Sequence, residues 1–264
     1  MQKNMGTPFG WIGGKSQLTD DIMKKMPKHN LYVEVFGGSL AVLYAKKRQL
    51  SSNYREVVND INSNLVNLHR IIQTRPESLR QQLHHMLISR EVFYSIKRQK
   101  WKPRNDIEKA AFYFYLLSQS FGSKGDNFAM SAKTKRPKDM YKSFMVWSRR
   151  LKFVTIENMS FDELITKYDS EDAFFYCDPP YVGTEDYYKN TGGFGIDQHT
   201  ALCDCLSNIK GKFLVSYNDC EVVRDLYKNF NVENTKQIKY TLNGKNNKNI
   251  SEVFITNYKI NSLF

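Results

Sequence analysis

The feature that most constrains the fold is a short apolar run that ends in an acidic, proline-rich turn. Residues 173–177 (Ala-Phe-Phe-Tyr-Cys) have the composition of a buried strand, and Asp178, Pro179, Pro180 and Tyr181 follow its carboxyl end. In an open α/β sheet, ligands bind beyond the carboxyl ends of the strands. The turn offers the carboxylate of Asp178, backbone carbonyls and the aromatic ring of Tyr181. Because proline has no backbone N–H, the two prolines bring no donor that would compete for these carbonyls. The turn predicts a site for a planar group that carries an amine, such as adenine; the simpler alternative is a turn that only ends a strand.

Length and composition restrict the class of protein. A chain of 264 residues, of which 41% are hydrophobic, can form one large or two modest domains. It has no apolar stretch close to the roughly 20 residues that a membrane helix needs, and its first residues contain no apolar signal region. We therefore expect a soluble, cytoplasmic protein with no membrane partner.

The cysteines predict neither disulfides nor a metal site. Cys203 and Cys205 lie two residues apart, without a histidine or a further cysteine at the spacing of a zinc site. Cys177 and Cys220 are isolated in the sequence. We expect buried thiols in a reducing compartment and no bound metal.

The net charge of +12 is concentrated in one segment. Residues 70–150 contain 18 basic and 6 acidic residues, whereas the rest of the chain contains 21 of each. A charged run is usually only a solvated surface. An excess confined to one aromatic-rich third of the chain favours a polyanion-binding surface.

Strand-like and helix-like segments alternate on both sides of this basic segment. A strand at 31–36 runs into Gly37 and Gly38 and then into a helix at 40–48, which is the first unit of a nucleotide-binding sheet. Two period-2 strands at 232–240 and 252–258 predict a C-terminal antiparallel hairpin. The other expected elements are a helix ending at Met26 and capped by Ser16 or Thr19, strands at 54–58, 153–156 and 213–217, and helices at 62–73, 161–167, 197–208 (capped by Asp197) and 220–228.

The basic segment is expected to be mainly helical, at 77–87, 89–99, 106–120 and 138–150. Residues 121–137 between these helices predict a mobile loop, whose composition suits contact with phosphates and bases. Its candidate nucleic-acid-binding residues are Lys124, Asn127, Lys133, Lys135 and Arg136. We therefore expect one domain from 1–69 and 151–264, with residues 70–150 inserted into it.

Three features that follow strand ends occur in order along the chain: the Gly37-Gly38 turn, Asp60, and the turn at 178–181. With the preceding Gly13-Gly14-Lys15 loop, they resemble the Dam-like family of DNA adenine-N6 methyltransferases, which use S-adenosylmethionine. The resemblance spans nearly the whole chain, and the order of its motifs is that of the alpha group. It implies a Rossmann-like methyltransferase sheet, a helical target-recognition domain at 70–150, and duplex DNA as the partner.

The resemblance assigns roles in cofactor binding. Trp11 and Lys15 would border the methionine end of the cofactor, where the ammonium group could pair with the carboxylate; a surface lysine is the alternative. Asp60 would accept hydrogen bonds from the ribose hydroxyls, although an N-cap of the following helix is also open. Phe194 would line the cofactor pocket, and Asp178 would border it.

Phe36, Gly37 and Gly38 resemble the cofactor turn of the family, where glycine permits close approach of the backbone. This chain departs from the family pattern at two positions. The family usually has a glycine where Leu40 stands and a proline where Val35 stands.

The catalytic chemistry implied by the resemblance rests on the turn at 178–181. Asp178 and the Pro179 carbonyl would accept the two hydrogens of the adenine amine, so that its lone pair points at the sulfonium methyl. Pro180 stiffens the turn, and Tyr181 would stack on the flipped base. Aspartate at this position favours adenine over cytosine, because cytosine-N4 enzymes more often have serine there.

Two other functions remain open at this point. An RNA adenine methyltransferase would use the same chemistry, and a non-catalytic nucleic-acid-binding protein could keep the same fold. The sequence also leaves open the recognition sequence (GATC or another), the oligomeric state, and whether a cognate restriction endonuclease is a partner.

Overall fold

The computed structural model describes residues 5–49, 51–129, 139–184, 193–235, 238–239 and 249–260. It divides the chain into two compact units. We call the first the helical unit (Met1–Ser16, Gly38–Arg48 and Asn62–Ile156) and the second the sheet unit (Gln17–Gly37, Gln49–Ile61 and Glu157–Phe264). None of the described helices is long and apolar enough to cross a membrane.

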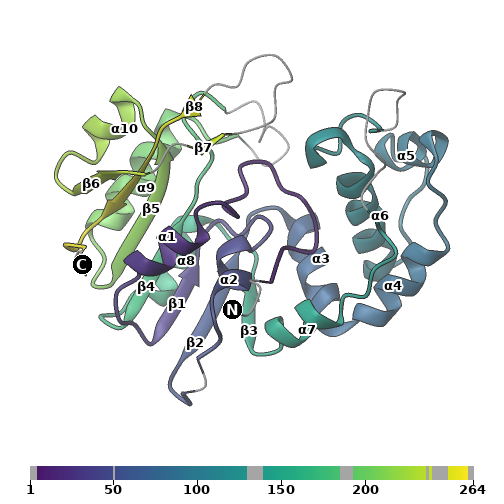
Figure 1. Ribbon diagram of the computed structural model, residues 1–264, viewed down its shortest axis with the longest axis horizontal. Helices are drawn as coiled ribbons and strands as arrows, with labels where there is room; N and C mark the ends of the chain where they lie inside the picture. The colour runs from purple at the N-terminus through teal and green to yellow at the C-terminus, as the bar shows by residue number, and fades with distance from the viewer. Residues whose placement is uncertain are drawn as a thin grey trace. The chain divides into compact units, whose positions relative to one another are not determined.

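A seven-stranded sheet has the strand order β3-β2-β1-β4-β5-β9-β6 (Figure 1). β1 pairs in parallel with β2 and β4, and β4 pairs in parallel with β5. The strands are β1 (Leu31–Glu34), β2 (Arg55–Asn59), β3 (Val154–Glu157, where the chain passes between the units), β4 (Ala173–Cys177), β5 (Lys212–Asn218), β6 (Asn231–Asn234) and β9 (Glu252–Thr256). The expected mixed α/β fold with a mostly parallel sheet is confirmed.

The C-terminal strands run antiparallel, as the period-2 pattern predicts. β9 lies between β5 and β6 and is antiparallel to both. A separate two-stranded sheet, β7 (Ile238–Lys239) with β8 (Asn249–Ile250), continues the same hairpin. The predicted turn of this hairpin, at 243–247, lies outside the described residues.

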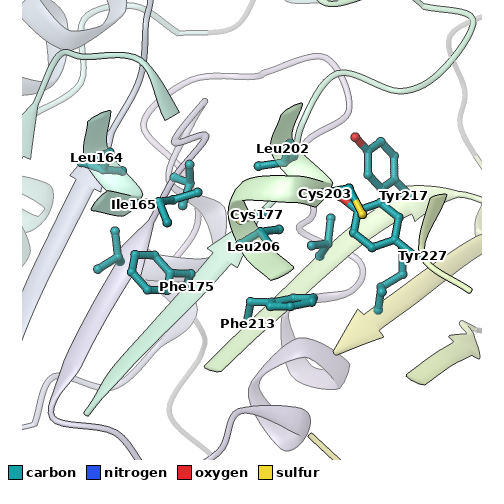
Figure 2. Close-up of a cluster of buried hydrophobic side chains, with 14 of the residues drawn as sticks. Leu164, Ile165, Phe175, Cys177, Leu202, Cys203, Leu206, Phe213, Tyr217 and Tyr227 are labelled. Carbon is teal, nitrogen blue, oxygen red and sulfur yellow. The ribbon is translucent and has the colours of Figure 1, made fainter. Parts of the chain in front are cut away.

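One face of the sheet is covered by α8 (Phe161–Tyr168), α9 (Ile196–Ser207) and α10 (Glu221–Leu226). Figure 2 shows Leu202 and Leu206 of α9 in one apolar cluster with Phe175 of β4 and Phe213 of β5. Cys177 and Cys203 lie in the same core, where burial raises the pKa of both thiols. All four cysteines lie in the described residues and are free thiols. The expectation of buried thiols is confirmed for Cys177 and Cys203, whereas Cys205 and Cys220 are only partly buried.

The opposite face of the sheet packs against α1 (Thr19–Lys25). The Lys25 ammonium lies 5.8 Å from the centre of the Phe254 ring, and Tyr258 Oη donates to the Lys25 carbonyl (2.9 Å). This face also carries buried polar side chains on β1 and β5, including Glu34 and Ser216. Such groups are retained in a core only where they are hydrogen-bonded. This face of the sheet therefore has a hydrogen-bonded polar interior.

The helical unit is built around one buried helix. α6 (Asp106–Gln119) contacts α3, α4 and α5 (Figure 1). Its Phe114 and Tyr115 are fully buried, which confirms that the aromatic run at 112–117 is core. The other helices of the unit are α2 (Ala41–Ala45), α3 (Ser63–Thr74), α4 (Pro76–His84), α5 (Arg90–Lys97), the 3₁₀ turn η1 (Phe121–Ser123) and α7 (Met145–Leu151).

The helix predicted at 138–150 begins later than expected. Residues 139–144 are not helical, and α7 starts at Met145. The Asp139 carboxylate accepts a hydrogen bond from the Tyr141 amide (2.8 Å), and Tyr141 Oη donates to the Met86 carbonyl (3.1 Å). A short acidic side chain that bonds to a nearby backbone N–H competes with helix formation, which explains the late start.

Two predicted helix caps are wrong. Leu18, not Ser16 or Thr19, is the N-cap residue of α1, and its side chain makes no capping hydrogen bond. α9 begins after Gly195, so Asp197 lies within its first turn. There the Gln198 side chain accepts a hydrogen bond from the Gly195 amide (2.9 Å). An acidic residue in the first turn still favours the helix through the helix dipole.

Candidate active site

The strand order reverses between β1 and β4. From β1 the chain proceeds to β2 and β3 on one side, and from β4 it proceeds to β5 on the other. In open α/β sheets, the crevice at such a switch point is where ligands bind. Phe36 and Gly37 follow the end of β1, and Asp178 follows the end of β4. The sheet unit therefore places part of the predicted cofactor turn and the predicted catalytic acid at the same edge.

A chain of hydroxyl groups fixes the Asp178 carboxylate. Ser216 Oγ donates to Asp178 Oδ1 at 3.1 Å, and Tyr176 Oη lies 3.2 Å from Ser216 Oγ. Because the single hydroxyl hydrogen of Ser216 goes to the carboxylate, Tyr176 must donate to Ser216. Burial, followed by the charge of Asp178, raises the pKa of Tyr176 well above its ordinary value, so the phenol stays a donor.

Hydrogen bonds from Thr184 and Asn218 fix the backbone of the turn after Asp178. Pro179 and Pro180 are buried. The Tyr181 carbonyl accepts from the backbone amide (2.9 Å) and hydroxyl (2.7 Å) of Thr184. Asn218, at the end of β5, donates to the Val182 carbonyl (3.1 Å). These bonds make the turn a fixed platform that follows a buried strand.

Aromatic rings line the same region of the sheet unit. The ring of Phe194 lies 5.6 Å from that of Phe36, 5.9 Å from that of Phe161 and 4.8 Å from that of His199. His199 Nδ1 lies 2.7 Å from Tyr217 Oη, and the Tyr217 ring lies 6.3 Å from the Tyr181 ring. Phe194 thus belongs to one aromatic group with Phe36, and an apolar wall of this kind suits a planar heterocycle.

Asn59, at the end of β2, fixes the backbone beyond β1. Its side-chain amide donates to the Val35 and Met159 carbonyls (3.1 Å each), and its Oδ1 accepts from the Met159 amide (3.0 Å). Its own carbonyl accepts from the Gly37 amide at 2.7 Å. From the sequence, only Asp60 was predicted as a functional residue at this strand end, and Asn59 was not. The signal that could have found it is a buried amide at a strand end, which needs several hydrogen bonds.

Asp60 follows directly and is partly exposed at the carboxyl end of β2. Its backbone carbonyl accepts from the Asn158 side chain (2.8 Å). It is not the N-cap of α3, because the Asn62 side chain accepts from the amides of Asn64 (3.1 Å) and Leu65 (3.2 Å). The alternative interpretation of Asp60 as a helix cap is therefore wrong.

Within the helical unit, Trp11 packs directly on Gly38. A Cβ atom at Gly38 would lie 2.8 Å from Trp11 Nε1, and the residue has φ of +50°. Gly13, in the loop after Trp11, has φ of +70°. Lys15 is 4% exposed and donates to the Gly13 carbonyl (3.0 Å). The structure thus brings three predicted cofactor residues of this unit together: Trp11, Lys15 and Gly38.

His69 supports the same turn from α3. Its Nε2 lies 2.8 Å from the Gly38 carbonyl, so Nε2 carries the donated hydrogen. Burial lowers the pKa of His69 from 6.5 to about 4, which keeps the ring neutral. Leu40 follows the turn in the left-handed region (φ 58°, ψ 39°) at the position where the family usually has glycine. Sequence reasoning missed His69, because nothing in a helical pattern indicates a bond to a distant carbonyl.

The predicted nucleic-acid-binding loop is partly described. Ser120 and Phe128 form an isolated antiparallel bridge, and the Phe121 amide donates to the Asn127 carbonyl (3.0 Å). Lys124 is partly buried and Asn127 is exposed in this turn. Residues 121–129 therefore fold into a bonded turn, where a mobile loop was expected. The other candidates, Lys133, Lys135 and Arg136, lie outside the described residues.

Comparison with known proteins agrees with these features. A family model described as D12 class N6 adenine-specific DNA methyltransferase matches residues 11–241. The chain belongs to this family. It is thus an adenine-specific DNA methyltransferase of the Dam-like type, as its sequence motifs suggest.

Curated relatives of this methyltransferase carry consistent names. The Type II methyltransferase M1.LlaDCHI of Lactococcus lactis subsp. cremoris is 30% identical over 94% of both chains. The retron Ec67 DNA adenine methylase of Escherichia coli is 30% identical over 86% of this chain and 82% of its own. A DNA adenine methylase of Haemophilus influenzae is 27% identical over 82% of this chain and 81% of its own.

Proposed function

We propose that this methyltransferase transfers a methyl group from S-adenosylmethionine to the N6 amine of an adenine flipped out of duplex DNA. The observation that carries the proposal is the fixed acceptor turn at the switch point of the sheet. Asp178 is oriented there by Ser216, and two buried prolines follow it. A carboxylate has about four lone-pair sites on its two oxygens, so Asp178 can accept from Ser216 and from an amine at once.

The residues of the turn activate a poor nucleophile. The lone pair of the adenine amine is delocalised into the ring. Donation of its two hydrogens to the Asp178 carboxylate and the Pro179 carbonyl shifts the nitrogen toward sp³ geometry and aims the lone pair away from the turn. When bound, S-adenosylmethionine supplies an electrophilic methyl group. The surplus proton of the methylated amine can then pass to water.

Tyr181 offsets part of the cost of base flipping. Extruding a base from a duplex costs a few kcal/mol. A base stacked on an aromatic side chain gains about 1–3 kcal/mol. Thr184 holds the Tyr181 backbone, and the Tyr181 ring lies 6.3 Å from the Tyr217 ring. Pro180, which lacks an N–H, presents no donor that would compete for the acceptors of the turn.

The sheet unit has groups that fit S-adenosylmethionine. Phe36 and Phe194 offer an apolar wall for the adenine ring of the cofactor. Asp60 at the end of β2 offers acceptors for ribose hydroxyls, and Gly37 permits close approach of the backbone. We further propose that Trp11, Lys15 and Gly38 contact the methionine portion, with the Lys15 ammonium pairing with its carboxylate, and that Asp178 borders the bound cofactor.

Segment 70–150 of the helical unit is proposed to recognise the target DNA. The inserted segment 70–150 carries the whole charge excess. Phosphate contacts from basic residues position a protein on DNA, and contacts to base edges supply specificity. We propose Lys124, Asn127, Lys133, Lys135 and Arg136 as DNA-contacting residues. The catalytic domain would then comprise 1–69 and 151–264.

Methyl transfer by an Asp178→Ala variant tests this function. We expect the wild-type enzyme to transfer radiolabelled methyl groups from S-adenosylmethionine to adenine in duplex DNA. The variant should lose at least about 100-fold in kcat, the effect of removing one such group from an active site. Asp204→Ala is the matched control, since this carboxylate is exposed on α9 of the same unit. Label in structured RNA alone would overturn the DNA substrate, and unchanged kcat in Asp178→Ala would overturn the mechanism.

The cellular setting follows from the same proposal. An enzyme that modifies DNA would act in the cytoplasm of a cell without a nucleus. One relative is named as a Type II methyltransferase, so a cognate restriction endonuclease is a proposed partner. Digestion of methylated and unmethylated DNA by endonucleases of matching specificity would test for it.

A further inference from the structure

The connection between α5 and α6 carries a dense cluster of exposed cations around a tryptophan. Residues 97–104 read Lys-Arg-Gln-Lys-Trp-Lys-Pro-Arg, with five basic residues and no acidic one. All eight residues are exposed, and Trp101 is 48% exposed. We call this segment the Trp101 turn. The segment thus combines positive charge with the flat face of an indole, and this combination is typical of surfaces that bind nucleic acids.

Backbone bonds give the Trp101 turn a defined shape. Gln99 has φ of 56°, in the left-handed region that ends helices. The amides of Lys100 (2.9 Å) and Trp101 (3.2 Å) both donate to the Ser95 carbonyl. Asn105 then caps α6 by accepting from the Glu108 amide (2.9 Å). The turn is thus fixed at both ends, and ordering it on a partner costs little entropy.

The five cations of the turn divide into those that contact other parts of the helical unit and those that form no ion pair. Arg98 is of the first kind, because its guanidinium lies 5.3 Å from the centre of the Tyr94 ring. Lys97 donates to the Asp126 carbonyl (2.6 Å) and Arg104 pairs with Glu108 (3.2 Å), so both serve the fold. Lys100 and Lys102 form no ion pair within the part of the chain that the structure describes. These two ammonium groups flank the Trp101 indole in sequence. The Lys97 bond also ties the turn to the 120–129 loop, which contains the DNA-contacting candidates Lys124 and Asn127.

The chemistry of the turn matches a sugar-phosphate backbone. Ammonium groups and the indole N–H are donors only, and phosphate oxygens are acceptors only. The indole face can pack on a deoxyribose ring. We propose that the Trp101 turn is an anchor for DNA, contacting phosphates and sugars without reading bases. The proposal rests on the proposed function in one respect, namely that the helical unit binds DNA.

Charge reversal at Lys100 and Lys102 tests the anchor. Lys100→Glu/Lys102→Glu should weaken binding of a labelled duplex at least tenfold and reduce the slope of log Kd against log salt by about two. Because the contact does not read bases, the loss should be equal for duplexes with and without the methylated site.

The chain offers a matched control. Lys210 and Lys212 are also exposed, also two residues apart, and lie in the sheet unit. Lys210→Glu/Lys212→Glu changes the net charge by the same amount. Equal losses of affinity in the two double variants would overturn the anchor, because the effect would then be one of overall charge. An unchanged affinity in Lys100→Glu/Lys102→Glu would also overturn it.

Tryptophan fluorescence gives a second readout that does not depend on methyl transfer. DNA titrated into the wild-type enzyme should quench emission, and part of the quenching should be absent in Trp101→Phe. Trp101→Ala should weaken binding roughly fivefold or more, the worth of one aromatic contact to nucleic acid. Identical quenching in wild type and Trp101→Phe would contradict contact with the indole. Both binding assays need no methyl donor, so failure of the methylation assay would count against the proposed function and not against the anchor.

Discussion

At the scale of single residues, the site depends on side chains that position others. Asp178 and Ser216 are brought together by the parallel register of β4 and β5, which pairs Cys177 with Val215 and places these two residues next. A hydrogen bond from a neutral donor to a charged acceptor contributes about 1.5–3 kcal/mol. Ser216 therefore fixes the orientation of the Asp178 carboxylate.

We predict that Ser216→Ala lowers kcat about tenfold or more and leaves the KM for DNA near its wild-type value, because only the aim of the carboxylate changes. Tyr176→Phe removes the donor to Ser216 but keeps the bond between Ser216 and Asp178, so its effect on kcat should be smaller. Steady-state kinetics on duplex DNA measure both. A Ser216→Ala enzyme with unchanged kcat would show that Asp178 does not need this bond.

His69 makes stability depend on pH. Its pKa is lowered from 6.5 to about 4 by burial. Below about pH 6.5 the unfolded chain takes up a proton at His69, and the folded protein does not until about pH 4. The contribution of His69 to the free energy of unfolding is thus fully present above pH 6.5. It falls by roughly 3 kcal/mol as the pH drops toward 4.

His69→Gln keeps a donor for the Gly38 carbonyl and cannot titrate in this range. We expect the wild-type protein to lose more unfolding free energy than His69→Gln between pH 7 and pH 4.5, measured by denaturant titration. Parallel pH profiles for the two proteins would mean that His69 is not the titrating group.

At the scale of elements, the Trp11 loop and the Gly38 turn are mutually dependent. Both Gly13 and Gly38 have positive φ, but only at Gly38 would a Cβ meet the Trp11 ring. Near Gly13 an added Cβ finds nothing within 4 Å. Substitution of Gly13 therefore measures the energetic cost of a positive φ alone. Substitution of Gly38 measures this cost together with the cost of contact with the Trp11 ring.

We predict that Gly13→Ala destabilises the protein by about 1–2 kcal/mol, the cost of a left-handed conformation for an L-residue. Gly38→Ala should destabilise it by this amount and by about 1–3 kcal/mol more, because the added methyl group overpacks against Trp11. In the double variant Trp11→Ala/Gly38→Ala, the extra cost should disappear. Chemical denaturation of the wild type, Trp11→Ala, Gly38→Ala and the double variant completes the double-mutant cycle. An equal cost for the two single glycine variants would argue against close packing of Trp11 on Gly38.

Most strands and helices could be predicted, since they depend on local apolar patterns. The run at 173–177 is buried throughout, and the run at 110–117, two alanines followed by aromatic and leucine residues, belongs to a core helix. What could not be predicted depends on contacts between distant residues. Ser216 gains its role from strand register, and His69 gains its role from a carbonyl 31 positions away. The left-handed Leu40 follows no local rule, because side chains other than glycine rarely adopt that conformation.

At the scale of the whole molecule, the two units carry opposite charge. The segments of the helical unit contain 24 basic and 6 acidic residues, for a net charge of +18. Those of the sheet unit contain 15 basic and 21 acidic residues, for a net charge of −6. A polyanion is therefore attracted to one unit and repelled by most of the other. This division agrees with the proposed binding of DNA through the helical unit.

The charge division predicts steep salt dependence of DNA binding. Each phosphate contact contributes about 0.9 to the slope of log affinity against log salt, so charge reversal at Lys133, Lys135 and Arg136 should reduce the slope by about three. Combined with Lys100→Glu/Lys102→Glu, the reductions should add, because separate phosphates release separate counterions. Anisotropy titrations at several salt concentrations measure each slope. If the variant that combines all five substitutions has the same slope as the double or the triple variant, the two basic segments compete for the same phosphates. If the slope of the Lys133/Lys135/Arg136 variant equals that of the wild type, residues 133–136 are not part of the interface.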